Sequence, residues 1–230
     1  MKKISADELP WFWAMQNQIY LFDKHDANWI EAAGRGWSQV NGQDDLYTFL
    51  KAYGLIRGPL ASLFGNKFNS KRNVFLKICH ENFSPPLDVK NAVKDLSGRW
   101  AAALQEVNKC FGVGAVSATS KMLWFYHPEY MVMFDHNNKI GLSKWLVENG
   151  CIGHNKDLDH TNFLSMFSFY FDQIANKNIE VVRYYFNRKY PYSRRVAEKR
   201  LWLAGSGTET ETLASLKAGL ELLPVDIGKS

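Results

Sequence analysis

The stretch FGVGAVSATSKMLWFYHPEYMVMFD, residues 111–135, decides which fold this chain is expected to adopt. Two glycines, Gly112 and Gly114, separate a helical pattern that ends near Cys110 from a second one that starts near Ala115. Because glycine permits backbone angles and close approaches that a Cβ forbids, the segment predicts a tight hairpin between two helices. The exposed N–H groups and the positive dipole end of the second helix would suit a phosphate oxygen. A glycine turn that only joins two core helices has the same pattern, since GxG is common.

Asp135 closes this stretch, after the short segment YHPEYMVM and before another helical pattern, HNNKIGLSKWL. An aspartate directly before a helix is expected to be its N-cap, with the carboxylate accepting hydrogen bonds from backbone N–H groups. A capping carboxylate at the mouth of a cleft can also stay ionised and stabilise a developing positive charge. The position of Asp135 thus predicts a helix cap and is compatible with a catalytic role.

The rest of the chain reads as one helix after another, with apolar residues at three- and four-residue spacing. Residues 84–110 predict a helix that starts at its prolines and is broken or bent near Ser97 and Gly98, and Gly150 is expected to end a later helix. No alternating pair of strands is convincing, although EYMVMF, residues 129–134, can be read as a short one. We therefore predict an all-α protein of about ten helices, with two lobes around a cleft.

Composition places the chain among ordinary globular proteins. Of its 230 residues, 46% are apolar and 22% are charged, which argues against disorder and provides for a large core. The cysteines, Cys79, Cys110 and Cys151, form no CxxC pair, and no third residue at metal-ligand spacing joins His127 and His136, so we expect no metal and no cofactor. The N-terminus lacks the apolar core of a signal peptide, and no apolar run approaches membrane-spanning length. Since unpaired cysteines suit a reducing compartment, we expect a cytoplasmic monomer with no membrane partner.

Positive charge is concentrated towards the C-terminal end of the chain. Residues 177–200 contain eight Lys or Arg and two Glu, a net charge of +6, against +5 for the whole chain. The segment also carries five aromatic residues: Tyr184, Tyr185, Phe186, Tyr190 and Tyr192. Basic residues interleaved with rings are typical of a surface that faces phosphates and stacks on bases, and Arg194 and Arg195 are its best candidates for a DNA contact. A solvated helix face with tyrosines packed behind it has the same pattern.

The order of hairpin, helix, turn and aspartate resembles that of the helix–hairpin–helix DNA glycosylases. CFGVG, residues 110–114, is similar to the LPGVG of that superfamily, with Phe111 where proline is usual. SKMLWFYHPEYMVMFD, residues 120–135, further resembles short prokaryotic proteins described as 8-oxoguanine-glycosylase-like. The core of the resemblance covers residues 97–150, within a single glycosylase-like domain spanning residues 1–230.

The resemblance implies an enzyme that flips a base out of double-stranded DNA and cleaves its N-glycosidic bond. The base would be an oxidised purine, as the family name suggests, or a phage-borne modified base, since small glycosylase-like proteins occur in bacterial defence as well as in DNA repair. Asp135 would stabilise the oxocarbenium-like sugar and activate the nucleophile. The hairpin residues Gly112, Val113 and Gly114 would face a phosphate. Trp124 and Gln16 are candidates for the base pocket, although a core position for the first and a solvent-facing position for the second are the ordinary expectations.

One position departs from the family pattern. Members that also cut the strand have a lysine just after the hairpin, and Val116 stands there in this chain. Lys121 is the nearest amine, and at five residues further on it lies about 140° around the helix from Val116. We favour a monofunctional enzyme in which Asp135 activates a water and an abasic site is the product. In the alternative, the helix starts later or is rotated, and Lys121 is the nucleophile of a lyase reaction.

Two other functions remain open from the sequence. The missing lysine is consistent with a non-catalytic DNA-binding protein that uses only the hairpin. A helical interaction protein whose basic segment binds an acidic protein partner is the third interpretation.

Overall fold

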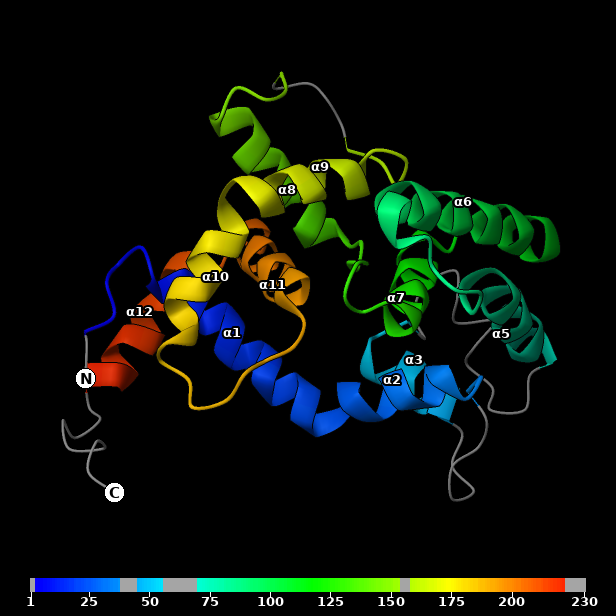
Figure 1. The fold of residues 1–230 in the computed structure, drawn as a ribbon, viewed down its shortest axis with the longest axis horizontal. Helices are drawn as coiled ribbons and strands as arrows, with labels where there is room; N and C mark the ends of the chain where they lie inside the picture. The colour runs from blue at the N-terminus through cyan, green and yellow to red at the C-terminus, as the bar shows by residue number, and fades with distance from the viewer. Residues whose placement is uncertain (1–2, 38–44, 56–69, 154–157, 222–230) are drawn as a thin grey trace. The chain divides into compact units, whose positions relative to one another are not determined.

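The computed structural model describes residues 3–37, 45–55, 70–153 and 158–221, and every regular element in these ranges is a helix (Figure 1). The all-α prediction is thereby confirmed for the described residues. Their eleven α-helices form nine helical segments, because π-helical turns at Phe22–Asp26 and Phe171–Ala175 join α1 to α2 and α9 to α10.

The chain folds into two compact units: unit 1 comprises residues 1–21 and 135–230, and unit 2 comprises residues 22–134. The α-helices described in unit 1 are α1 (Leu9–Leu21), α8 (His136–Glu148), α9 (Phe163–Tyr170), α10 (Asn176–Arg183), α11 (Ser193–Gly205) and α12 (Glu209–Glu221). Those described in unit 2 are α2 (Ala27–Gly34), α3 (Asp45–Ala52), α5 (Ser70–Phe83), α6 (Ala92–Phe111) and α7 (Val116–Tyr126). The predicted hairpin therefore belongs to unit 2, whereas Asp135 begins the larger segment of unit 1.

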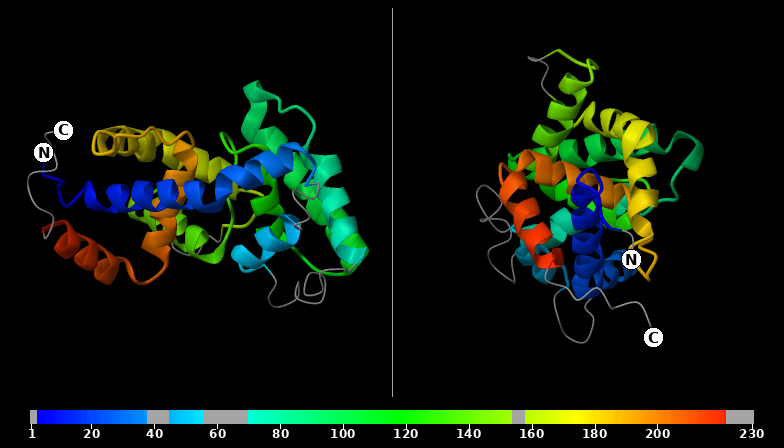
Figure 2. Two further views of the ribbon diagram at one scale, coloured as in Figure 1. Left: turned by 90° about the horizontal axis from the view of Figure 1, so that it is seen from below. Right: turned by 90° about the vertical axis from the view of Figure 1, so that its left-hand side faces the viewer.

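Unit 1 is built around α1 and α11. Ser5 and Glu8 form a capping box at the start of α1, in which the Ser5 hydroxyl accepts from the Glu8 N–H at 3.2 Å and the Glu8 carboxylate accepts from the Ser5 N–H at 2.9 Å. Helices α10, α11 and α12 pack against α1, and α8 packs against α11 (Figures 1 and 2). The interior of this unit is strongly aromatic, as the buried Trp11, Phe167 and Tyr170 show.

Two glycines bring α8 and α11 into backbone contact. A Cβ added to Gly141 would lie 2.1 Å from the carbonyl oxygen of Leu201, and one added to Gly205 would lie 2.0 Å from the carbonyl oxygen of Asn137. Both distances are far below van der Waals contact, so no other residue fits at either position without moving a helix. The glycine contacts therefore fix the register of α11 along α8.

Unit 2 packs α5, α6 and α7 together, with α2 on α7. Helix α6 runs unbroken through Ser97 and Gly98, so the predicted break there does not occur. A helical glycine weakens a helix by only about 1 kcal/mol, and α6 buries a continuous apolar face that includes Leu96 and Trp100. The helix also starts at Ala92, after a 3₁₀ turn that Asp88 caps, and not at the prolines.

The possible strand at residues 129–134 forms no sheet in the described part of the chain. Its apolar residues Met131, Val132 and Met133 are buried, but they lie in a connecting segment between α7 and α8. This short apolar run is buried without forming a strand. A strand needs a second strand to pair with, and the sequence pattern does not show whether one is present.

Candidate functional site

The hairpin has the form that the sequence predicted. Helix α6 ends at Phe111, and Gly112 follows in the left-handed conformation (φ 66°), with its N–H donating to the carbonyl of Asn108 at 2.7 Å. Helix α7 begins at Val116. A Cβ at either Gly112 or Gly114 would meet nothing within 4 Å, and both glycines are exposed. The turn is therefore open to a ligand on the surface of unit 2, and only Gly112 needs to be glycine for its backbone angle.

Ser120 of α7 fixes the residue that precedes Asp135. Its hydroxyl accepts a hydrogen bond from the N–H of Phe134 at 3.0 Å and lies 3.4 Å from the carbonyl oxygen of the same residue. The ring of Phe134 packs on that of Trp100, with 5.6 Å between centroids. The sequence offers no signal for this contact, because a serine inside a helix more often faces its own backbone.

Asp135 is the N-cap of α8, as predicted. Its backbone is extended (φ −145°, ψ 174°), and its Oδ1 accepts from the N–H of Asn138 at 2.9 Å. The side chain is half-buried, and its Oδ2 makes no hydrogen bond to any residue in the described ranges. One carboxylate oxygen thus holds the helix start while the other can face a ligand.

A buried polar network links the first turn of α8 to α11. The amide of Asn138 donates to Glu198 at 2.9 Å, and the same carboxylate pairs with the guanidinium of Arg195. All three side chains are buried. A buried charge pair of this kind is stable only when its members are paired and hydrogen-bonded, which the α8 amide helps to achieve.

Lys199, which follows Glu198 on α11, is a residue that the sequence analysis missed. Its Nζ lies 4.0 Å from the ring centroid of Trp202 and 5.4 Å from that of Trp13 on α1. Burial, together with the positive charge of Arg195, lowers the pKa of Lys199 to about 8, although Glu198 and Asp135 act in the opposite direction. A substantial part of this amine is therefore neutral near physiological pH.

The depressed pKa of Lys199 predicts a pH-dependent stability. Because the unfolded chain binds this proton more tightly, the free energy of unfolding should rise as pH increases from about 8 towards 10.5, the ordinary value. Lys199→Met should therefore be more stable than the native chain at pH 7, by about 2 kcal/mol. Urea unfolding at pH 7 and pH 10 measures this difference, which should shrink at the higher pH. A difference that is equal at the two pH values would contradict the prediction.

Lys121 lies half-buried on α7, with its Nζ 5.7 Å from the ring centroid of Tyr53. The Tyr53 hydroxyl donates in turn to the buried Asp26 at 2.9 Å. Because α7 begins at Val116, the later helix start considered for the Lys121 alternative does not occur. Lys121 belongs to unit 2, whereas Asp135 belongs to unit 1.

The two base-pocket candidates lie in different environments. Trp124 is fully buried in the core of unit 2, at 4.7 Å from the ring of Phe125, and Gln16 is exposed on α1. Gln18, two residues further on, is fully buried, and neither atom of its amide has a hydrogen-bond partner among the described residues. An unsatisfied buried amide is uncommon, so Gln18 is a stronger candidate for a ligand contact than Gln16.

The basic segment divides into internal and exposed residues. Arg195 is buried in the network described above, and Arg194 is half-buried, donating to the Ser168 hydroxyl at 3.0 Å and lying 4.9 Å from the ring centroid of Phe171. Burial lowers the pKa of Arg194. The exposed residues of the segment include Lys177, Tyr184, Arg188 and Lys189, and Tyr184 is 75% exposed. A phosphate would meet these side chains before the two arginines of α11.

The rings of this segment mostly pack inward. Tyr185 and Phe186 both contact Phe12 of α1, with ring centroids 6.0 and 4.9 Å away, and Tyr190 is buried. Of the five aromatic residues only Tyr184 is open enough to stack on a base. The interpretation of tyrosines packed behind a solvated basic surface therefore describes most of the segment.

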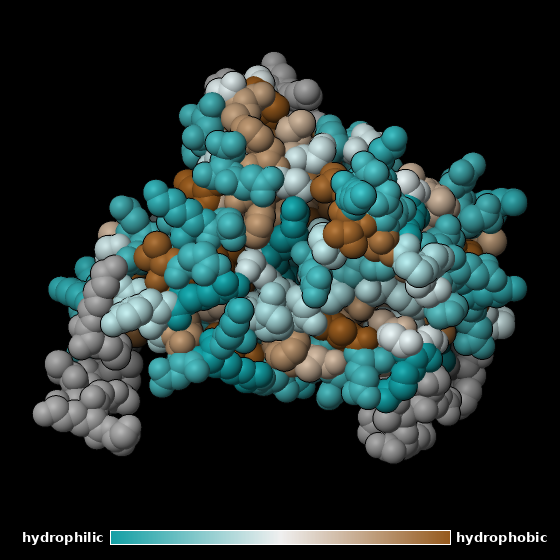
Figure 3. All heavy atoms as spheres, viewed as in Figure 1, coloured by the Kyte–Doolittle hydropathy of each residue, from teal (hydrophilic) through white to brown (hydrophobic). Residues whose placement is uncertain are grey.

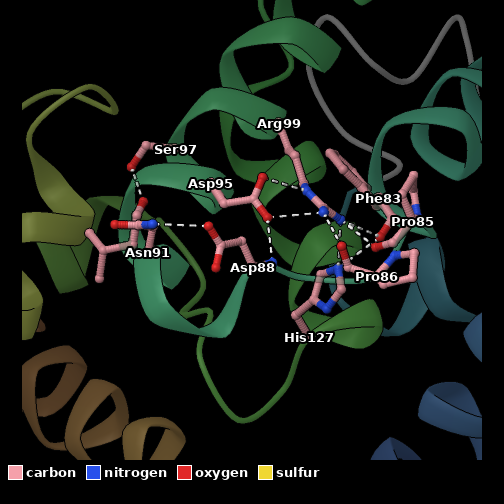
Figure 4. Close-up of polar contacts among 10 residues, drawn as sticks. Phe83, Pro85, Pro86, Asp88, Asn91, Asp95, Ser97, Arg99 and His127 are labelled. Carbon is pink, nitrogen blue, oxygen red and sulfur yellow. Dashed lines mark hydrogen bonds and ion pairs between the residues drawn. The ribbon is translucent and has the colours of Figure 1, made fainter.

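His127 belongs to a polar cluster that holds the loop between α5 and α6 (Figure 4). Its Nε2 donates to the carbonyl of Phe83 at 2.7 Å, and burial is the main cause that lowers the pKa of His127. Arg99 donates to several acceptors around this loop: both carboxylate oxygens of Asp95 at 2.9 and 3.0 Å, the carbonyl of Pro85 at 2.5 Å and that of Pro86 at 2.7 Å. This cluster explains why α6 begins where it does, and it assigns His127 a structural role.

Within the described ranges, no group of three or more His, Cys, Asp or Glu side chains is placed to hold a metal ion. None of the helices described is long and apolar enough to cross a membrane. On the face shown in Figure 3, apolar residues occur in small groups among hydrophilic ones. Comparison with known proteins found no matching protein-family model, no matching curated protein and no matching solved structure.

Proposed function

We propose that this protein is a DNA N-glycosylase that excises a damaged or modified base and leaves an abasic site. The observation that carries the proposal is the sequence of local structures from α6 to α8. An exposed glycine hairpin joins two helices, and the aspartate that follows caps the next helix through one oxygen, while the other makes no hydrogen bond to any described residue.

In the proposed reaction the bond between the base nitrogen and C1′ of the sugar breaks, and the base leaves with the bonding electron pair. Positive charge then develops on the sugar, where the ionised carboxylate of Asp135 stabilises it. A water adds to C1′ and gives its proton to Asp135 or to the departing base, so that the products are the free base and an abasic sugar. The fully buried amide of Gln18 has both a donor and an acceptor that could pair with the edge of a flipped base.

DNA binding in this proposal uses two surfaces. The hairpin of unit 2 would contact one phosphate through the N–H groups around Gly112 and the start of α7. In unit 1 the exposed Lys177, Arg188 and Lys189 would supply contacts that do not depend on sequence. Arg194 and Arg195 are engaged inside unit 1, so we assign them a supporting role in place of the direct contact expected from the sequence.

A negative charge placed on the hairpin should weaken DNA binding. Val113→Glu would put a carboxylate beside the proposed phosphate, and at surface dielectric values this repulsion should raise the Kd about tenfold. Fluorescence anisotropy with a labelled duplex at low salt measures the change. Val89→Glu is the matched control, because it makes the same substitution on the same unit at a residue that is 60% exposed. Equal effects of the two substitutions would show that the hairpin does not contact DNA.

A second candidate function is a DNA-binding protein without catalysis. Val116 favours it, because this valine stands where the strand-cutting helix–hairpin–helix glycosylases have a lysine. The discriminating experiment incubates the pure protein with duplexes bearing oxidised purines or phage-type modified cytosines. Half of each product is treated with hot alkali before the strands are separated. Strand breaks only after alkali support a monofunctional glycosylase, and breaks without alkali would show that the enzyme also cuts the strand at the abasic site. Steep salt-dependent binding with no base release from any duplex would favour the non-catalytic function.

A further inference from the structure

The amine of Lys199 belongs to α11, which is in close backbone contact with α8. The backbone contacts at Gly141 and Gly205 fix α11 against α8, so the position of Lys199 along α8 is determined by the helix pair itself. The amine lies over two indole rings, with its Nζ 4.0 Å from the ring centroid of Trp202 on its own helix and 5.4 Å from that of Trp13 on α1. Rigid elements hold this amine, as a reactive group requires.

The side chains of Lys199, Trp13 and Trp202 are each half-buried. The amine is therefore removed from bulk water and yet is not sealed in the core. A surface lysine held only for solubility would extend into water, and a purely structural one would pair with a carboxylate. The amine of Lys199 instead lies over the faces of two aromatic rings.

The charged groups around Lys199 come from two helices. Arg195 and Glu198 lie on α11, and Asp135 lies at the start of α8. The rings from α1 and α11 add no titratable group. With burial, this arrangement leaves the pKa of Lys199 at about 8, so the neutral, nucleophilic amine is available at moderately alkaline and neutral pH.

We propose that Lys199 is a nucleophilic amine that forms an imine with an aldehyde, and that its natural substrate is the ring-opened sugar of an abasic site. The identity of that substrate rests on the function proposed above, since the aldehyde is the product of base excision. The reactivity of the amine does not rest on it.

The proposed step balances as follows. The Lys199 nitrogen attacks C1′ of the aldehyde, and loss of one water gives a protonated imine. A base then removes a proton from C2′, the C3′–O bond breaks, and the 3′ phosphate leaves with the bonding electron pair. Water finally hydrolyses the imine and restores the amine. The strand is cut without an oxidant or a reductant, so this step would consume the abasic site left by base excision and would give strand breaks without alkali.

The first experiment tests the amine without DNA. Formaldehyde with cyanoborohydride at pH 7.5 converts each accessible neutral amine to a methylamine, and peptide mass spectrometry gives the rate for each lysine. Lys199 should be methylated about tenfold faster than Lys144, an exposed lysine on the neighbouring α8. Methylation of Lys199 at the rate of Lys144 or more slowly would overturn the proposal.

The second experiment uses a duplex with a preformed abasic site and borohydride, which reduces the imine to a stable protein–DNA adduct. The native chain and Lys121→Arg should give the adduct, and Lys199→Arg should reduce it at least tenfold. Arginine preserves the charge and the stacking on tryptophan but forms no imine, so a folded variant is expected. Loss of the adduct in Lys121→Arg with retention in Lys199→Arg, or no adduct from the native chain, would overturn the proposal.

The glycosylase function and the imine chemistry of Lys199 can be disproved independently of each other. The preformed abasic site bypasses base excision, so an adduct through Lys199 can form even when no modified base is released. Base release without an adduct would instead leave the glycosylase proposal intact and remove the imine step.

Discussion

Replacing Asp135 with asparagine is expected to reduce base release about 100-fold or more, while the fold is retained. The carboxylate is proposed to stabilise positive charge on the sugar, and an amide of the same shape lacks the negative charge that does so. Because asparagine is as good an N-cap as aspartate, the hydrogen bond to the N–H of Asn138 should persist. Single-turnover assays on a duplex with an excisable base, scored after hot alkali, measure the loss.

Asp135→Ala separates the two roles of the side chain. It removes both the charge and the cap, so it should show the same loss of base release together with about 1 kcal/mol of lost stability. Unfolding curves for the two variants provide that comparison. If Asp135→Asn released the base at the native rate, the catalytic role of this residue would be wrong and its capping role would be sufficient to explain the structure.

Replacing Gly141 with alanine is expected to destabilise the protein by about 3 kcal/mol. The new Cβ would lie 2.1 Å from the carbonyl oxygen of Leu201, which is helical backbone and cannot rotate away. Relief requires α8 and α11 to separate, and this would disrupt the buried hydrogen bond between Asn138 and Glu198. Urea unfolding measures the loss, and Gly205→Ala, with a contact of 2.0 Å to Asn137, should behave in the same way.

Gly98→Ala is the matched control for these substitutions. Gly98 is also inside a helix, but a Cβ there would meet nothing within 4 Å, and the residue is exposed. The change should stabilise the protein by about 0.5–1 kcal/mol, because alanine has the higher helix propensity. A loss at Gly98 as large as that at Gly141 would mean that general helix effects, and not the close approach of two backbones, determine the result.

The sequence by itself was sufficient for features that depend on near neighbours along the chain. The all-helical character followed from apolar spacing, and the N-cap role of Asp135 followed from its position before a helical pattern. Gly112 and Gly150 both adopt the left-handed conformation that ends a helix. Each feature is determined within about one helical turn, where a single residue's preference meets little competition.

Sequence reasoning was less reliable where a local preference met long-range packing. Gly98 was expected to mark a break or a bend, but α6 continues through it without a break because its buried face outweighs one glycine. Residues 129–134 were read as a possible strand, yet they form a connection between two helices in which Met131, Val132 and Met133 are buried. In both cases the burial of apolar area, of the order of 2 kcal/mol per large side chain, exceeds the local term.

The environments of the charged residues were decided only by the tertiary structure. Arg195 was expected to contact DNA, but Glu198 and the distant Asn138 bury it, and the i,i+3 spacing of Arg195 and Glu198 was the one local signal of this pairing. In the sequence Lys199 is one cation among eight in its segment, and only the fold shows that α1 and α11 each bring a tryptophan ring to its amine. Residue type and spacing along one helix determine caps and turns, whereas desolvation depends on which other helices come near. The approach of α8 to α11 depends here on Gly141 and Gly205, each of which lies against the backbone of the other helix. Only the folded chain reveals these contacts and the desolvation that accompanies helix packing.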